Sequence, residues 1–156
     1  MRKIFLGIIL ASSLLFSFEM DYDKDTACLV RHIKVYKDPK WVAKIELKNG
    51  KKVFFSSPKS MFEFYFRPGK WPEFNIHSES DFKNIYVTDY ETTQTIKAKG
   101  AFFVYGSDAT SPAGDDLVPF DSYKTAEEFA KEHNGKRIFG FREVSRGLIN
   151  WLNDSL

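Results

Sequence analysis

The sequence predicts an α+β fold in which two small ββαβ units pack against each other and a further helix ends the chain. Strand-like runs with period-2 alternation lie on both sides of two short helical segments. Residues 55–64 and 120–129 also align at a constant offset, with phenylalanine, serine and lysine at matching positions. Neither unit is large enough to bury its own sheet, so we expect the two to cover each other. The alternative is chance similarity between two ordinary helix starts.

The first unit is expected at residues 28–90. Asn49-Gly50 is a strong hairpin signal, and Ser57-Pro58 is typical of a helix start, with serine as the cap and proline in the first turn. The expected elements are a strand or extended approach at 28–36, strands at 41–48 and 51–56, a helix ending before Pro68, a polar loop at 67–83 and a strand at 85–90.

The second unit is expected at residues 94–156, including the terminal helix. Capping-box spacing from Ser60 to Glu63 and from Thr125 to Glu128 competes with the serine caps, so each helix has two candidate starts one turn apart. The expected elements are strands at 95–98 and 101–105, a Gly/Ser/Pro loop, a strand at 117–120, a helix at 122–134 capped by Gly135, a strand at 136–141 and a helix at 143–152.

Composition favours a globular protein that is not an enzyme. With 43% hydrophobic and 28% charged residues, the chain can bury a core and is not of the disordered class. Without Arg2 and Lys3, its 23 basic residues become 21 against 21 acidic ones, which leaves no charge excess for nucleic acid. The stretch at residues 84–121 contains no nucleophile–base pair and no glycine loop for phosphate, and no small-molecule substrate is expected. The oligomeric state stays open.

The N-terminus has the form of a secretory signal. Arg2 and Lys3 precede an apolar run at residues 4–16, which is short for a membrane span. We therefore expect a signal peptide at 1–18, a flexible leader at 19–27 and export to the periplasm, with an uncleaved membrane anchor as the alternative. Cys28 does not follow a small-residue signal end, so a lipoprotein is not expected.

Four motifs carry a resemblance to a known family. They are V-T-D-Y at 87–90, A-F-F-V-Y-G-S at 101–107, S-P-A-G-D-D-L-V-P-F at 111–120 and A-E-E-F-A-K-E-H-N-G at 126–135. With them the chain resembles the NosL family, the copper-binding accessory proteins of nitrous oxide reductase. The likeness reaches back to Trp41 and Cys28. It implies two ββαβ modules in a fold similar to alkylmercury lyase. It also implies Cu(I) as cargo, and nitrous oxide reductase or its membrane maturation complex as partner.

The resemblance places the copper site at Cys28, where this chain is divergent. The family carries a C-P-V-C-G-M-like motif here, and Arg31 and Ile33 replace its second cysteine and its methionine. Ala113 replaces the methionine of the later loop. Cu(I) prefers thiolate and thioether ligands, and of these positions only Cys28 keeps one. In an exported protein a lone cysteine is buried, paired with another molecule or used as a soft ligand.

His32 is the candidate that compensates for the lost donors. In an extended strand it would lie about 13 Å from Cys28, so the two could share a metal only if the residues between them form a tight loop. The alternative is a surface histidine beside a small buried thiol. Met61 and His133 are minor ligand candidates. The spacing of Met61 is that of a core residue, and His133 is expected at a helix end near the last carbonyls.

Other chemistry is less favoured. Asp115 and Asp116 resemble a carboxylate pair, but neighbours on a strand point to opposite faces, so a solvated loop end is expected. Alkylmercury lyase needs two cysteines, which this chain lacks, and a thiol enzyme using Cys28 beside Arg31 would lack a resolving cysteine. The first interpretation is a periplasmic Cu(I) chaperone for nitrous oxide reductase. The alternative is a metal-free protein-binding module that assists enzyme or transporter assembly.

Overall fold

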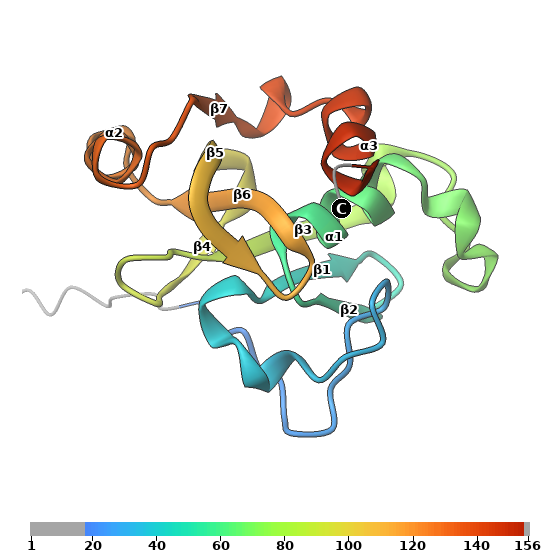
Figure 1. The fold of residues 1–156 in the computed structure, drawn as a ribbon. Coiled ribbons are helices and arrows are strands. Elements are labelled where there is room, and N and C mark those ends of the chain that lie inside the picture. Colours follow the sequence, from blue (N-terminus) through green and yellow to red (C-terminus); the bar gives the residue numbers. More distant parts are fainter. Residues whose placement is uncertain (1–17, 155–156) are drawn as a thin grey trace, which may run out of the picture.

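The computed structural model describes residues 18–154 and confirms the α+β class, with two antiparallel sheets and three helices in the described part (Figure 1). The expected signal peptide at 1–18 falls, apart from Phe18, outside the described residues. The first sheet has the order β2-β1-β3-β4 and the second the order β6-β5-β7. The elements are β1 (Ala43–Leu47), β2 (Lys52–Phe55), α1 (Pro58–Phe66), β3 (Phe82–Thr88), β4 (Thr95–Lys97), β5 (Phe102–Ser111), β6 (Gly114–Phe120), α2 (Tyr123–Glu132), β7 (Arg137–Gly140) and α3 (Arg146–Asp154).

Local signals set the first hairpin and both helix starts. Asn49-Gly50 turns β1 into β2, with Gly50 at φ +88°, a conformation that favours glycine. The Ser57 side chain caps α1 by accepting a bond from the Ser60 amide at 3.2 Å. Ser122 caps α2 in the same way, from the Thr125 amide at 3.1 Å. The two serines therefore begin the helices, and the competing capping boxes lie inside them.

The second sheet differs from the expected pattern in its hairpin. The Gly/Ser/Pro loop predicted before residue 117 is wrong, because β5 and β6 continue pairing as far as Ser111 and Gly114. Between the Tyr105–Leu117 and Thr110–Asp115 pairs, four residues of β5 oppose a single residue of β6, which makes an irregular bulge. β4 was assigned to the second unit from sequence, and it pairs with β3 in the first sheet.

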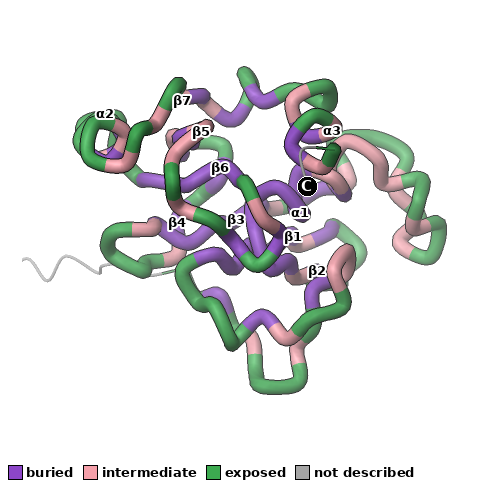
Figure 2. The backbone as a smooth tube through the Cα atoms, in the orientation of Figure 1, coloured by how far each residue is buried: buried purple, intermediate pink, exposed green. Residues whose placement is uncertain are grey.

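Helix α1 joins the two sheets. Its Phe62 is fully buried, and its ring lies 5.4 Å from Phe103 of β5 and 5.1 Å from Phe141, which follows β7. Figure 2 shows buried chain through β1, β3, α1 and β6 and exposed chain at the loops. A second apolar cluster lies under α2, where Phe129 packs on Phe120 at 4.9 Å between ring centroids. The units thus cover each other as expected.

Residues 19–27, expected to be a flexible leader, lie against the first sheet. Phe18 forms a bridge with Thr95 of β4, and Met20 is buried in the main core. The Lys44 ammonium of β1 donates to the Glu19 carbonyl at 2.8 Å. No helix within residues 18–154 is long and apolar enough to cross a membrane.

The Asp21 carboxylate fastens this segment, and its removal is expected to destabilise the fold in a pH-dependent way. Burial acts to raise the pKa of Asp21, but hydrogen bonds from Lys44 and Lys52 outweigh it and hold the pKa below its usual value. Because the pKa of Asp21 is lower in the folded state than in the unfolded state, where it is near 3.9, its carboxylate stabilises the fold when the pH is above that unfolded-state pKa. This stabilisation is lost as the pH falls through the folded-state pKa. We expect Asp21→Asn to cost about 1 kcal/mol at pH 7, because solvent screens this partly exposed group, and to cost nothing at strongly acidic pH.

Urea unfolding at both pH values measures this difference. Asp25→Asn is the matched control, because the Asp25 side chain is 98% exposed and its removal should leave stability unchanged. A loss for Asp21→Asn that is the same at every pH would contradict the assigned role of its charge.

Candidate functional site around Cys28

Cys28 begins a tight turn, so the strand or extended approach predicted at residues 28–36 is wrong. The Cys28 amide donates to the Ile33 carbonyl at 2.8 Å, and the His32 amide donates to the Cys28 carbonyl at 2.9 Å. Ala27 and Lys34 bridge across its base. His32 takes the left-handed conformation that closes the turn, with φ +58°. Cys28 and His32 are therefore brought into one tight loop, the condition under which they could share a metal.

The thiol and the imidazole of this turn lie in different surroundings. Cys28 is 1% exposed and belongs to the main apolar core, and its sulfur accepts a bond from the Arg31 amide at 3.3 Å. His32 is exposed. In this closed arrangement the sulfur is covered, and a metal ion from solvent has no direct path to it.

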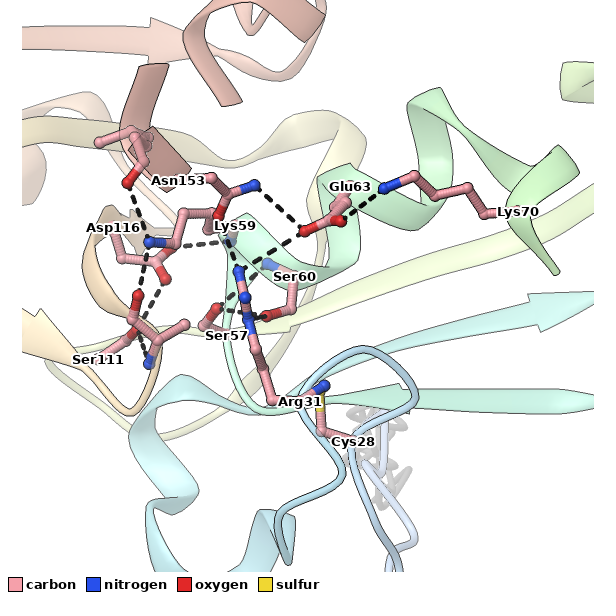
Figure 3. Close-up of polar contacts among 12 residues, drawn as sticks. Cys28, Arg31, Ser57, Lys59, Ser60, Glu63, Lys70, Ser111, Asp116 and Asn153 are labelled. Atoms are coloured by element: carbon pink, nitrogen blue, oxygen red, sulfur yellow. Dashed lines mark hydrogen bonds and ion pairs between the residues drawn. The ribbon is translucent and has the colours of Figure 1, made fainter. Parts of the chain in front are cut away.

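The Arg31 side chain connects the turn to two helices (Figure 3). Its Nε donates to the Ser60 hydroxyl on α1 at 3.3 Å, and its Nη2 donates to the Asn153 side-chain oxygen on α3 at 2.7 Å. Its guanidinium also lies 3.6 Å from Glu63. The Glu63 carboxylate in turn accepts a hydrogen bond from the Asn153 side-chain amide and pairs with the Lys70 ammonium, each at 3.2 Å. The result is a charged network on one side of the turn.

Lys59 places a second cation on the other side of the α1 N-terminus. The residue is fully buried, and its ammonium donates to the Ala113 carbonyl at 2.5 Å and the Leu152 carbonyl at 3.3 Å. Burial lowers the pKa of Lys59, and the negative charge of Asp116 opposes that shift. The ammonium thus joins α1 to the 111–114 turn and to α3.

Asp116 is the anionic partner inside this network, and the expected solvated loop end is wrong for it. Only 3% of Asp116 is exposed, whereas Asp115 is exposed. Its carboxylate accepts from the Lys59 amide and the Ser111 hydroxyl at 2.7 Å, and from the Leu117 amide at 2.8 Å. Burial raises the pKa of Asp116, and these hydrogen bonds only partly offset it. The 111–114 turn is thereby held against the start of α1.

The two minor candidates lie in the surroundings expected for structural residues. Met61 is fully buried in the core beside Phe62. His133 caps the C-terminal end of α2, where its ring stacks on Phe129 at 4.3 Å and its Nδ1 lies 2.9 Å from Asp108 of β5. Across the described residues, no three His, Cys, Asp or Glu side chains are arranged to hold a metal ion.

Comparison with known proteins identifies the chain. The NosL family model matches residues 19–149. The chain belongs to the NosL family. The fold is similar to the crystal structure of the copper chaperone NosL from Shewanella denitrificans, with a TM-score of 0.71 and 23% identity over 84% of this chain and 98% of that one. The solution structure of apo-NosL from Achromobacter cycloclastes matches with a TM-score of 0.46 and 22% identity, covering 69% of this chain and 87% of that one. No curated protein sequence matches significantly.

The copper site that the resemblance placed at Cys28 differs from the family pattern in its side chains. A guanidinium stands at residue 31, and aliphatic side chains stand at residues 33 and 113. As the structure stands, these residues do not fit an accessible Cu(I) site, because the Cys28 sulfur is covered and the side chains at 31, 33 and 113 supply no soft donor. Copper binding by this NosL would require the turn to move.

Three network residues were not found by sequence reasoning. Lys59 recurs as Lys124 in the repeat, and only the first of the two is buried. Asp116 begins the run 116–120, every residue of which is buried, so the apolar residues after it were the available signal. Asn153 carried no signal, because its role depends on where α3 packs.

Proposed function

We propose that this NosL protein is an exported, non-catalytic accessory protein that carries Cu(I) for the maturation of nitrous oxide reductase. The observation that supports this role is Cys28, which begins a compact turn braced on α1 in a chain whose family match spans residues 19–149. Copper would be cargo, taken up and released by exchange of soft ligands.

Ligand roles follow from the turn. Cys28 would supply the thiolate once the turn opens, and the exposed His32 on the same turn would supply the second donor. The partner would be nitrous oxide reductase or its membrane maturation complex, and the location the periplasm, in line with the signal-like residues 1–18.

A Cu(I) titration against a competing chelator under anaerobic conditions tests the proposal. We expect stoichiometric uptake by the wild-type protein, weakened by more than about 100-fold in Cys28→Ser because the only sulfur donor of the turn is lost. His32→Ala should weaken uptake less, and His77→Ala, on a remote loop, should not change it. Equal uptake by the wild-type and Cys28→Ser proteins would refute the assignment.

One observation favours a second function, that of a metal-free module for enzyme or transporter assembly. The buried thiol and the two cations, Arg31 and Lys59, oppose entry of a metal ion into this region. This function predicts no strong Cu(I) uptake by the wild-type protein. It also predicts that co-purification with the maturation partner survives Cys28→Ser.

A further inference from the structure

We infer that Arg31 is a positioning residue that latches the Cys28 turn shut and so controls access to the thiol. The inference rests on the proposed function, because it concerns how copper would reach Cys28. It names the regulation of the site rather than a ligand. The evidence is the set of contacts that the turn makes with the rest of the protein.

The turn is held mostly by bonds within itself. The bonds from Cys28 to Ile33 and from His32 to Cys28, and the bridge at its base, all join residues that move together. The Lys34 ammonium also reaches only Asp25, a neighbour in the chain. Toward the body, the Leu29 amide donates to the Phe54 carbonyl at 3.0 Å. The turn can therefore move as a unit without losing its own hydrogen bonds.

Arg31 supplies the side-chain anchor. Among the described residues of the turn at 27–34, its side chain alone makes hydrogen bonds or ion pairs outside residues 25–34. It reaches α1 and α3, elements 29 and 122 residues away in sequence. Charge-assisted hydrogen bonds of this kind are stronger than neutral ones. Loss of this one side chain should therefore free the turn while its internal bonds remain.

Opening the latch would uncover the thiol. Movement of the turn would carry the Cys28 sulfur out of the apolar core, where it is 1% exposed. Arg31 belongs to the turn and would move with it, so the expected effect of opening is greater access to the sulfur.

Alkylation of Cys28 by iodoacetamide, followed by mass spectrometry of the purified protein at fixed pH, measures access directly. We expect slow alkylation of the wild type and a rate about tenfold or more higher in Arg31→Ala, the change expected when a charge-assisted tether is lost. Asn153→Ala, which removes only the α3 partner, should give a smaller increase. Asn153→Ala also tests the latch if Arg31→Ala fails to fold. Arg31→Lys keeps the charge but not the planar fork, so it should restore the slow rate only in part.

A control separates a latch from general loss of stability. Phe129→Leu weakens the second apolar cluster and leaves the turn intact. Urea unfolding of each variant gives its global stability. The latch is refuted if Arg31→Ala is alkylated at the wild-type rate. It is also refuted if the alkylation rates of Arg31→Ala and Phe129→Leu rise only as much as their losses of global stability explain. Fast alkylation of Arg31→Ala, with no Cu(I) uptake by the wild type, would uphold the latch and refute copper carriage. Cu(I) uptake by the wild type, with slow alkylation of Arg31→Ala, would uphold carriage and refute the latch.

Discussion

Lys59→Met is expected to lower the free energy of unfolding by about 3–5 kcal/mol, because it removes a buried, hydrogen-bonded ammonium and the positive charge that acts on the buried Asp116 carboxylate. Methionine keeps most of the volume of lysine, so little of the effect comes from a cavity. What is lost is the ammonium that Ala113 and Leu152 bind through their carbonyls, and the charge that offsets the buried Asp116. Urea unfolding followed by circular dichroism measures the loss.

Two further variants identify the cause of that loss. Lys124→Met changes the equivalent lysine of the repeat, whose side chain is 84% exposed, and should cost less than about 0.5 kcal/mol. Adding Asp116→Asn to Lys59→Met removes the unpaired buried charge and should recover part of the stability. A Lys59→Met protein as stable as the Lys124→Met protein would show that the buried ammonium is not needed.

Phe62→Ala is the second large effect, with an expected cost of about 3–5 kcal/mol for removing a buried aromatic ring. Phe62 is fully buried and contacts Phe103 of the second sheet and Phe141 after β7, so its loss opens a cavity between the two units. We therefore expect the whole protein to lose stability, not only the first sheet.

Two probes of one urea titration test that expectation. Fluorescence of Trp41, which lies in the cluster under α2, is measured with Trp71 and Trp151 replaced by phenylalanine. It should change at the same urea concentration as the circular dichroism of the whole chain. Tyr123→Ala, which removes an aromatic ring that is 53% exposed, should cost less than about 1 kcal/mol. Separate transitions for the two sheets in Phe62→Ala would mean that the units do not depend on each other through this ring.

The parts of the fold that sequence predicted are those fixed by neighbouring residues. Asn49-Gly50 sets the hairpin because glycine takes the positive φ that the turn needs. Ser57 and Ser122 set the helix starts because each side chain bonds an amide three residues later. The matched stretches at 55–64 and 120–129 did indicate two copies of one ββαβ pattern.

The Cys28 segment was mispredicted because its conformation depends on distant residues. The alternation in residues 28–36 fits a strand, but the turn is held by Arg31 through Ser60 and Asn153, far along the chain. His32 adopts a positive φ that no local pattern announced. Propensity was overruled by tertiary contacts, a common outcome for short segments.

The charged interior could be predicted only in part. The apolar run that follows Asp116 was a usable signal for its burial, outweighed by the polar residues before it. Lys59 gave no such signal, because its burial depends on α3, and the Leu152 carbonyl that it binds lies 93 residues later. A lysine one turn from a serine cap ordinarily faces solvent, as Lys124 does.

Helix α3 has a consequence for the symmetry of the molecule. It packs on α1, whose first turn is sealed. Within residues 18–154 no corresponding element covers the first turn of α2, where Ser122, Tyr123 and Lys124 are exposed. This one helix therefore gives the two similar helix starts different environments. The start of α1 is buried and tolerates little substitution, whereas the start of α2 is exposed and tolerates change.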